Sequence, residues 1–587
     1  MSSRLTAETR TEALKRLAAS TIPGEELDVL IIGGGATGAG IALDAVTRGL
    51  STAVVEAQDW SSGTSSRASK LVHGGLRYLQ MLDFRLVLEA LRERDLLLTK
   101  IAPHLVRPLP FLYPLRVPVF ERLYVGSGIL LYDLLATVRR GKRALPFHRH
   151  LSRRGLTAVF PDFAQSAAIG AVEYWDANVD DSRYVMTVVR TAVSFGAHAA
   201  TRTEVVGLTK NADGAVDGAI LTDLETGKQF AAKARTVISS TGVWTEESQS
   251  LAGDKGGLRV LASKGIHIVV PRKRIKGKAG LILQTRRSVL FVIPWSRYWL
   301  IGTTDTRWTE DLVNPVVTSS DIDFVLAEAN AVLAHPISRD DIIGTYAGLR
   351  PLLQPGTKAD TDSAKVSREH TVASPVPGLV SIAGGKFTTY RVMARDAVDF
   401  ALGDKAKNMP SVTEGIPLIG AEGFRAAKRE LASVIEGLGW DKFRTDHLMH
   451  RYGANIREIA AMAQATPDLA RPLEHADAYV RAEIVYGMTH EGALHLDDLM
   501  MHRTRMVYEY PGEGVAALPE VAELAQSILG WSDEQTRHEV DVYRARAAAD
   551  AAAALEPDDA SASRVRERAA DIVPMIKLGS ARTNAKE

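Results

Sequence analysis

The chain has 587 residues, 46% of them apolar and 24% charged, and a formal net charge of +1. This length predicts two or more domains, and the balanced charge gives no indication of nucleic-acid binding. The absence of cysteine excludes disulfides, thiolate metal sites, a cysteine nucleophile and cysteinyl attachment of a cofactor.

Residues 1–26 predict an amphipathic lead-in helix that ends at Pro23-Gly24. The segment has no long apolar core, so we expect no signal peptide. The chain has no run of about twenty apolar residues, so we expect no transmembrane helix. Together with the lack of cysteine this favours a cytoplasmic protein, while peripheral membrane contact stays open.

A strand–glycine–helix–strand unit follows at residues 28–60. An apolar run at 29–32 predicts a buried strand, residues 39–46 predict a helix, and residues 52–55 predict a second strand. Glycines 33, 35 and 38 lie between the first strand and the helix in G-x-G-x-x-G spacing.

Each part of this unit suits a dinucleotide. Gly33 allows a tight turn, Gly35 lets the backbone approach a pyrophosphate, and Gly38 lets helix and strand pack closely. The helix N-terminus offers free N–H groups to the phosphates. Glu56 ends the second strand, where a carboxylate can accept hydrogen bonds from a ribose. The motif alone does not choose between NAD and FAD.

The next segment, residues 61–79, is dense in serine and glycine, with Lys70, His73, Arg77 and Tyr78 interleaved. Backbone N–H groups and small hydroxyls suit contact with a phosphate or a ring system. The segment leads directly into an apolar-periodic helix predicted over 84–101, so we expect it to be anchored at both ends.

Residues 103–120 are rich in proline, which excludes a long helix there, and residues 121–138 again predict a helix. A basic stretch follows without an intervening acid. An apolar helix beside a one-sign cluster is typical of an interfacial membrane contact, although such a cluster is also compatible with a solvated face. The cluster comprises Arg139, Arg140, Lys142, Arg143, Arg149, Arg153 and Arg154.

The remaining chain divides by pattern. Residues 171–243 predict strand, turn, helix and strand, then two hairpin strands and a buried strand ending at Thr241-Gly242. Residues 260–306 are strand-rich, and 379–400 repeat strand, Gly-Gly, helix. We therefore expect a lead-in at 1–26, interleaved cofactor and substrate domains at 27–405, a helical domain at 412–550 and a partly disordered tail at 551–587.

Taken together, several motifs are far more specific than the glycine pattern. They are IIGGGATGAGIALDAVTRGL, EAQDWSSGTSSRASKLVHGGLRYLQ, KGIHIVVP, VIPW, GTTD, YAGLRPL and AGGKFTTYR. With them the chain resembles FAD-dependent glycerol-3-phosphate dehydrogenases, within the D-amino-acid-oxidase-like flavoproteins. The resemblance covers most of residues 28–540.

The resemblance implies an α/β fold: a Rossmann-like FAD-binding domain, a mixed-sheet substrate domain and a C-terminal α-helical domain. It implies noncovalent FAD, oxidation of sn-glycerol 3-phosphate to dihydroxyacetone phosphate, and electron transfer to a membrane quinone. The expected partners are glycerol 3-phosphate, the quinone and an anionic membrane surface at the inner face of the cell membrane. A homodimer is compatible with the pattern.

The reaction removes a hydride from carbon and a proton from the hydroxyl. His73 is the candidate base, because imidazole titrates near neutrality and the Gly-Gly turn lets it approach a ligand. His267 is the alternative base, although its apolar neighbours are also typical of a core histidine. Arg350 is expected to assist by stabilising the alkoxide, and Lys386 follows a Gly-Gly turn whose helix N-terminus favours negative charge on a reduced ring.

Further residues complete the predicted site. Arginine matches phosphate oxygens in pairs, which favours arginines near the substrate. The predicted substrate contacts are Arg77, Tyr78, His267, Arg350, Arg368, Lys386 and Thr389. The predicted cofactor contacts are Gly33, Gly35, Ala36, Thr37, Gly38, Glu56, Ser65, Ser66, Ser69, Leu71, Val205, Gly242, Gly385, Lys386, Phe387 and Thr388.

Three other functions remain as alternatives. The first is an oxidase that passes electrons to oxygen, and the basic-apolar region at 107–154 favours quinone instead. The second is a non-catalytic protein with a flavin-binding fold, which would lack the substrate cations. The third is an NAD-dependent enzyme, which leaves SSGTSSRASKLVHGG and AGGKFTTYR unexplained.

Overall fold

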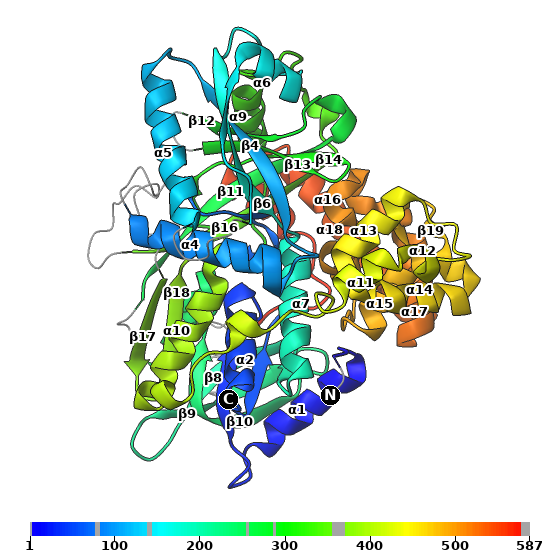
Figure 1. Ribbon diagram of the computed structural model, residues 1–587. Coiled ribbons are helices and arrows are strands. Elements are labelled where there is room, and N and C mark those ends of the chain that lie inside the picture. The colour runs from blue at the N-terminus through cyan, green and yellow to red at the C-terminus, as the bar shows by residue number, and fades with distance from the viewer. Residues whose placement is uncertain are drawn as a thin grey trace.

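The computed structural model describes residues 3–76, 83–137, 144–253, 258–285, 289–354 and 370–576. Figure 1 shows two layers of sheet, one above the other, with a group of helices to one side. The lower sheet contains the glycine unit, and the upper sheet contains the strand-rich segments.

The lower sheet has eight strands among the described residues and is mostly parallel. Its strands are β1 Leu27–Ile32, β2 Thr52–Val55, β7 His198–Ala200, β8 Thr203–Lys210, β9 Val216–Asp223, β10 Gln229–Ser239, β17 His370–Val376 and β18 Leu379–Gly384. The parallel order is β18-β10-β1-β2-β7, with β17 antiparallel at one edge and the β8–β9 ribbon attached to β10.

The apolar run of β1 is buried on both faces, as a central parallel strand requires. Val29 and Ile31 pack in the core beneath the helices, whereas Leu30 and Ile32 pack in the core on the opposite face. On the first face lie α2 Ala36–Thr47, α7 Asp181–Ser194 and α10 Tyr390–Leu402, and on the other lies α1 Ala7–Ala19. The lead-in helix predicted within residues 1–26 is therefore α1.

Strand β10 is one continuous strand where the sequence predicts two. The pattern before Thr241 predicted two hairpin strands and then a separate buried strand. In the structure, residues 229–233 of β10 pair antiparallel with β9, and residues 234–239 continue without a break and pair parallel with β1. Because one continuous strand pairs both with β9 and with β1, the β8–β9 ribbon is fixed directly to the parallel strands of the lower sheet.

The upper sheet has ten strands among the described residues. They are β3 Leu71–Val72, β4 Arg107–Leu115, β5 Arg149–Ser152, β6 Gly170–Asn178, β11 Val260–Pro271, β12 Gly280–Gln284, β13 Val289–Trp295, β14 Tyr298–Gly302, β15 Thr306–Arg307 and β16 Gly344–Leu353. The order is β15-β11-β14-β13-β12-β4-β6-β3, with β16 on β11 and β5 on β6. Pairing is antiparallel except between β12 and β4.

Helices cover both faces of this upper sheet. The core on one face includes residues of α6 Arg153–Val159 and α9 Ser319–Asn330, and the core on the other includes residues of α4 Phe84–Leu96 and α5 Phe120–Thr137. Strand alternation divides β11 between them: Ile266 and Ile268 pack toward α9, while Val269 packs on the α4–α5 side. The helix predicted over 84–101 is α4 continued by a π-helical turn at Leu97–Ile101.

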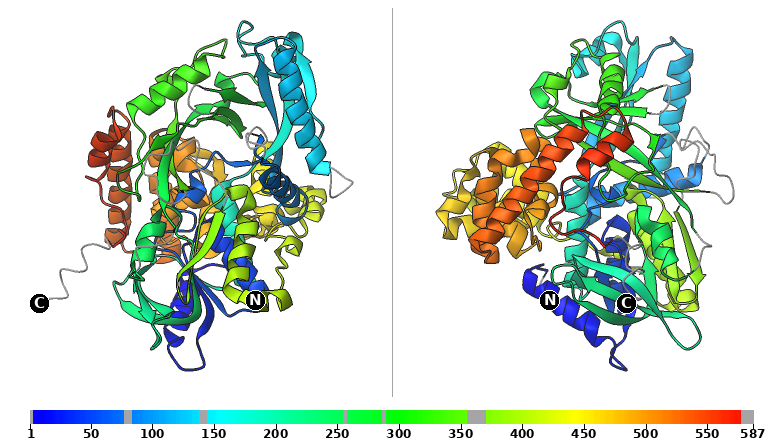
Figure 2. Two further views of the ribbon diagram at one scale, coloured as in Figure 1. Left: turned by 90° about the vertical axis from the view of Figure 1, so that its left-hand side faces the viewer. Right: turned by 180° about the vertical axis from the view of Figure 1, so that it is seen from behind.

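The third unit is helical (Figure 1, yellow to orange). Its elements are α11 Phe424–Arg429, α12 Leu431–Val434, α13 Lys442–Tyr452, α14 Ile456–Ala465, β19 Pro472–Leu473, β20 Ala476–Val480, α15 Arg481–Thr489, α16 Met506–Glu509, α17 Leu518–Leu529 and α18 Asp533–Ala553. A buried ion pair joins this unit to the glycine unit: Arg503 Nη2 donates to Asp59 Oδ1 at 2.8 Å. Figure 2 shows α18 and the following α19, Asp559–Arg566, behind the upper sheet.

The predicted fold class is confirmed: the protein is α/β, with a Rossmann-like domain, a mixed-sheet domain and a C-terminal α-helical domain. Among the described residues, no helix is both long enough and apolar enough to span a membrane. The proline-rich residues 103–120, where the sequence excluded only a long helix, contain β4.

Candidate active site

A cavity of about 450 Å³ lies between the two sheets. One end is lined by Gly33, Gly35 and Glu56 of the lower sheet's glycine unit. The other end is lined by His73, by His267 of β11 and by Arg350 of β16. The cavity therefore spans from the dinucleotide motif to the predicted substrate residues.

The glycine end presents a helix N-terminus to the cavity. Helix α2 begins at Ala36, and its N-cap, Gly35, makes no side-chain cap. Ser65 supplies one acceptor from a different segment, because its Oγ lies 2.9 Å from the Ala36 amide nitrogen. The free N–H groups and the dipole of the first turn favour an anion here.

Close backbone approach explains two of the glycines. A Cβ on Gly38 would lie 1.8 Å from the carbonyl oxygen of Gly33, which no side chain can tolerate. Gly33 has φ +105°, and a Cβ there would lie 2.9 Å from the carbonyl oxygen of Ser240, directly after β10. The tight turn and the helix–strand contact thus depend on glycine itself.

Glu56 lines the same end of the cavity. Its two carboxylate oxygens accept hydrogen bonds from the Gly34 N–H at 2.6 Å and the Gln58 N–H at 2.8 Å. Burial raises the pKa of Glu56 above its ordinary value, and the two backbone donors act against that rise. The carboxylate is fixed in place and keeps lone pairs for a further donor.

At the other end, the loop after β3 carries His73, and its backbone is held by groups from two different elements. The His73 N–H donates to Thr388 Oγ1 at 3.2 Å, in the turn that follows Lys386. The Gly74 N–H donates to the Tyr132 hydroxyl at 2.8 Å. His73 lines the cavity.

His267 is buried but also lines the cavity. Its ring stacks on Tyr346 at a centroid distance of 4.8 Å, and Nε2 lies 3.0 Å from Ser69 Oγ. Desolvation lowers the pKa of His267 well below 6.5, and the nearby charges of Arg350 and Lys70 lower it further. The imidazole is therefore neutral at pH 7.

Lys70 does not line the cavity. Its Nζ donates to Asp181 Oδ1 at 2.7 Å and to the Ser66 carbonyl oxygen at 2.9 Å. Burial lowers the pKa of Lys70 to about 8. This lysine fixes the serine-rich segment from behind, next to the cavity wall.

Arg350 reaches the cavity from β16 with its guanidinium supported by the loop after β14. Nη2 donates to Thr303 Oγ1 at 2.9 Å and to the Thr304 carbonyl oxygen at 3.1 Å, and Nη1 donates to Asp305 Oδ1 at 3.4 Å. A Cβ on Gly265 would lie 2.3 Å from both Arg350 Nη2 and Thr303 Oγ1, so a larger residue there would displace the guanidinium.

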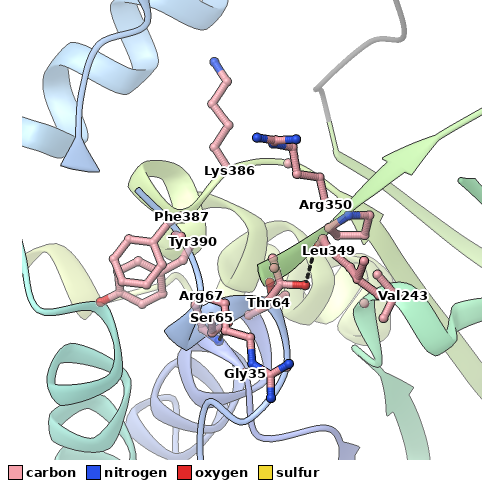
Figure 3. A pocket seen from close by; sticks show the side chains of 18 of the residues that line it. Gly35, Thr64, Ser65, Arg67, Val243, Leu349, Arg350, Lys386, Phe387 and Tyr390 are labelled. Carbon is pink, nitrogen blue, oxygen red and sulfur yellow. Dashed lines mark hydrogen bonds between the residues drawn. The ribbon is translucent and has the colours of Figure 1, made fainter. Parts of the chain in front are cut away.

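Lys386 and Arg350 project to the same side of the pocket, the upper side in Figure 3, while Gly35, Ser65 and Arg67 lie at the lower side. Strand β18 ends at Gly384, which has φ +79°, and Gly385 follows with φ +80°. A 3₁₀ turn at Phe387–Thr389 then leads into α10. In the same view, the hydrogen bond from Thr64 Oγ1 to the Leu349 carbonyl oxygen, 2.6 Å long, ties the serine-rich segment to β16.

Comparison with known proteins gives the family. Residues 28–395 match the family described as FAD dependent oxidoreductase, and residues 411–536 match the C-terminal domain of alpha-glycerophosphate oxidase. The chain is 47% identical over 546 residues to glycerol-3-phosphate dehydrogenase of Mycobacterium leprae, covering 93% of this chain and 92% of that protein. The chain belongs to the FAD-dependent glycerol-3-phosphate dehydrogenase family.

More distant relatives agree. The human mitochondrial glycerol-3-phosphate dehydrogenase is 37% identical over 542 residues, which cover 88% of this chain and 73% of that protein. The crystal structure of a glycerol-3-phosphate dehydrogenase from Bacillus halodurans, complexed with FAD, matches with a TM-score of 0.73 and 27% identity, over 91% of this chain and 96% of that one. The resemblance drawn from the motifs is confirmed, and the chain is an oxidoreductase with FAD as its cofactor.

The residues present fit FAD. The cavity offers a helix N-terminus for the pyrophosphate, a fixed carboxylate for the ribose, and a lining of backbone and small hydroxyls toward the histidine end. Most predicted cofactor contacts line it, namely Gly33, Gly35, Ala36, Thr37, Glu56, Ser65, Ser69, Leu71, Val205, Gly242, Gly385, Lys386, Phe387 and Thr388.

Three predicted site residues lie behind the wall rather than in it. Gly38 packs against the Gly33 backbone. Ser66 is fully buried, and its carbonyl oxygen accepts from Lys70. Thr389 is buried, and its Oγ1 donates to the Lys386 carbonyl oxygen at 3.4 Å. Arg77, Tyr78 and Arg368 lie outside the described residues.

Other residues in the wall were missed from the sequence. Phe111, Tyr174 and Phe291 line the cavity from three strands of the upper sheet. In the sequence these three aromatic residues appear only as apolar positions of alternating strands, and alternation does not indicate which face of a sheet contacts a ligand. Glu204 and Met575 also line the cavity, and nothing in their local sequence separates them from surface positions.

Proposed function

We propose that the protein oxidises sn-glycerol 3-phosphate to dihydroxyacetone phosphate at this cavity and passes the electrons to a membrane quinone. The observation that supports the first step is the single cavity that joins the dinucleotide end to His73, Arg350 and Lys386. When bound, FAD supplies the hydride acceptor.

His73 is the proposed base, which takes the proton of the substrate hydroxyl. His267 is less suitable, because its depressed pKa makes the ring a weak proton acceptor. Its stacking on Tyr346 fits a role in shaping the wall and orienting the substrate instead.

Arg350 is the proposed partner for the substrate's anionic oxygens. Three oxygens of the Thr303–Asp305 loop hold its guanidinium, so little side-chain freedom remains to be lost on binding. Lys386 projects to the same side (Figure 3) and adds a second positive charge. Together the two cations favour a phosphate and a developing alkoxide at this end.

The membrane part of the proposal rests on α5. The helix is apolar on both faces: Val125, Ile129 and Tyr132 are buried against the upper sheet. On the opposite face, Phe120 is 75% exposed, Leu123 68% and Leu134 47%. Tyr124, Leu130 and Leu131, with Val117, Val119 and Phe147 beside the helix, extend this exposed surface. We call these nine residues the α5 surface.

A lipid bilayer is the occupant that this surface fits best. Clustered exposed apolar side chains on one helix mark an interaction site, and α5 stands at the edge of the molecule in Figure 1. Arg116, Arg153 and Arg154 are exposed nearby in the sequence, which favours anionic headgroups. The predicted basic residues Arg139, Arg140, Lys142 and Arg143 lie outside the described residues.

Vesicle co-sedimentation tests the membrane proposal. Wild-type protein should bind vesicles of equal parts phosphatidylcholine and phosphatidylglycerol, and salt should weaken the binding but leave an apolar remainder. The double variant Phe120→Asp, Leu123→Asp should lose that remainder. Phe400→Asp, at a phenylalanine exposed to 47% on α10, is the matched control. Unchanged binding of the double variant would place the membrane surface elsewhere.

A second variant tests the contribution of basic side chains to vesicle binding. Each Lys or Arg near an anionic surface contributes about 1 kcal/mol. Reversing Arg139, Arg140, Lys142 and Arg143 to Glu should therefore release the protein from these vesicles at low salt. Reduction by substrate should be unaffected, because the proposed chemistry lies in the cavity. Retained binding would show that these four charges do not contact lipid.

The acceptor is tested by reoxidation. Protein reduced photochemically without oxygen is mixed either with quinone-loaded vesicles or with aerated buffer. Faster reoxidation by quinone supports the proposal. Equally fast reoxidation by oxygen would favour the alternative function, an oxidase. The match of residues 411–536 to the C-terminal domain of alpha-glycerophosphate oxidase supports this alternative.

A further inference from the structure

A buried hydroxyl from the outer helix reaches the loop that carries His73. Tyr132 is on the buried face of α5 and is 1% exposed. Its hydroxyl oxygen accepts the Gly74 N–H at 2.8 Å and donates to Asp176 Oδ1 at 2.7 Å. The same N–H lies 3.3 Å from Asp176 Oδ1, so the tyrosine is its nearer acceptor.

The carboxylate behind the tyrosine is itself fixed. Arg94 Nη1 donates to Asp176 Oδ1 at 2.8 Å, and its Nε and Nη2 donate to Asp95 Oδ1. Arg94, Asp95 and Asp176 are each at most 5% exposed. Burial raises the pKa of Tyr132 well above 10, so the phenol keeps its proton, which it donates to Asp176.

Gly74 leaves room for the Tyr132 hydroxyl beside the loop after β3. A Cβ on Gly74 would lie 2.4 Å from the Tyr132 hydroxyl oxygen and 2.5 Å from Leu91 Cδ2. A side chain at position 74 would therefore require Tyr132 and Leu91 to shift. On the other side of the same dipeptide, Thr388 Oγ1 accepts the His73 N–H.

We propose that Tyr132 is a positioning residue: its hydroxyl holds the Gly74 peptide and thereby aims His73 into the cavity. This inference rests on the base role proposed for His73. Two consecutive N–H groups each donate to a side-chain oxygen: that of Gly74 to Tyr132 of α5, and that of His73 to Thr388 in the turn before α10. Without the tyrosine hydroxyl, the Gly74 N–H keeps only its longer contact with Asp176, so the backbone that carries His73 is held less firmly. A misplacement of about 1 Å can slow a reaction about 100-fold.

The test is Tyr132→Phe, which removes only the hydroxyl oxygen. In anaerobic stopped-flow reduction of the holoprotein by sn-glycerol 3-phosphate, we expect the limiting rate to fall about 10- to 100-fold. The substrate concentration at half-maximal rate and the unfolding midpoint should stay close to wild type. Tyr113→Phe, on β4 in the same apolar core, removes a hydroxyl that is not an acceptor of the Gly74 N–H and is the matched control.

A second measurement does not depend on catalysis. Hydrogen exchange of residues 71–76 should quicken in Tyr132→Phe and not in Tyr113→Phe, because the Gly74 N–H has lost its nearer acceptor. Wild-type rate and wild-type exchange in Tyr132→Phe would overturn the inference. An equal rate loss in Tyr113→Phe would also overturn it, since general softening of the core would then be the cause. A wild-type protein that the substrate does not reduce would instead contradict the proposed function.

Discussion

The two ends of the cavity are built in opposite ways. At the glycine end, the turn, the N-terminus of α2 and Glu56 all come from one continuous segment, residues 28–56. At the histidine end, the wall comes from the loop after β3, from β11 and β16, and from the turn after β18. The structure of a continuous segment can be predicted from residue spacing alone. A cavity wall formed by several distant segments depends on how the two sheets pack against each other.

This difference predicts separable failures. Changes at the glycine end should remove the cofactor, and changes at the histidine end should leave the cofactor bound but slow its reduction. The largest effect is expected where an added side chain would clash with the backbone, and the smallest where only the pH dependence of stability changes.

The largest effect is expected for Gly38→Ala. The added Cβ would lie 1.8 Å from the Gly33 carbonyl oxygen, so the turn and the start of α2 must separate. We expect protein purified without FAD, measured as the ratio of flavin to protein absorbance. Gly128→Ala, in α5 with nothing within 4 Å of the added Cβ, is the control and should stay yellow. A fully flavinated Gly38→Ala protein would refute this view of the turn.

His73→Ala should separate the two ends most clearly. FAD content should match wild type, while reduction by substrate should slow about 100- to 10,000-fold, the usual contribution of a general base. The measurement is the anaerobic reduction rate at saturating substrate. His267→Ala is the comparison: if it shows the large loss and His73→Ala does not, the base is misassigned.

Arg350→Ala should have an intermediate effect. Loss of a charge-assisted hydrogen bond costs about 1.5–3 kcal/mol, so the specificity constant should fall about 10- to 100-fold. Plain glycerol, which lacks the phosphate, should be almost insensitive to the change, and Arg307→Ala, at an exposed residue of β15, should be neutral. Equal losses with both substrates would indicate a folding role for Arg350 instead.

Spacing alone predicts the local backbone of the glycine end. The strand, the glycine turn and the start of α2 lie where the spacing predicts them, because their geometry depends on neighbours a few residues away. The contacts of these residues with the cofactor stay predictions. His73, Arg350 and Lys386 were named chiefly from the family resemblance, and their roles remain predictions. The Tyr132–Gly74 contact could not be foreseen, since it joins residues 58 positions apart through the packing of α5 on the upper sheet.

The smallest effect concerns pH and Glu204, which lines the glycine end. Burial raises the pKa of Glu204 from 4.5 to about 7, although the Ile576 N–H donates to it. The folded protein thus binds this proton more tightly than the unfolded chain. The resulting stability is fully present below about pH 4.5 and is lost as the pH rises through about 7.

Glu204→Gln should remove this dependence. Across that pH window, the thermal unfolding midpoint of wild type should decline relative to the variant, whereas Glu12→Gln on the exposed face of α1 should follow wild type. Parallel curves for Glu204→Gln and wild type would show that the carboxyl does not titrate in this range.

One cavity is proposed to hold FAD from its glycine end and to present a glycerol phosphate to the flavin at its histidine end. The most direct measurement is anaerobic addition of sn-glycerol 3-phosphate to the wild-type holoprotein, followed by absorbance and by assay of the product. We expect the flavin absorbance to bleach with a rate that saturates in substrate, and one dihydroxyacetone phosphate to form per flavin bleached. An unchanged flavin spectrum in protein with full FAD content would contradict the account.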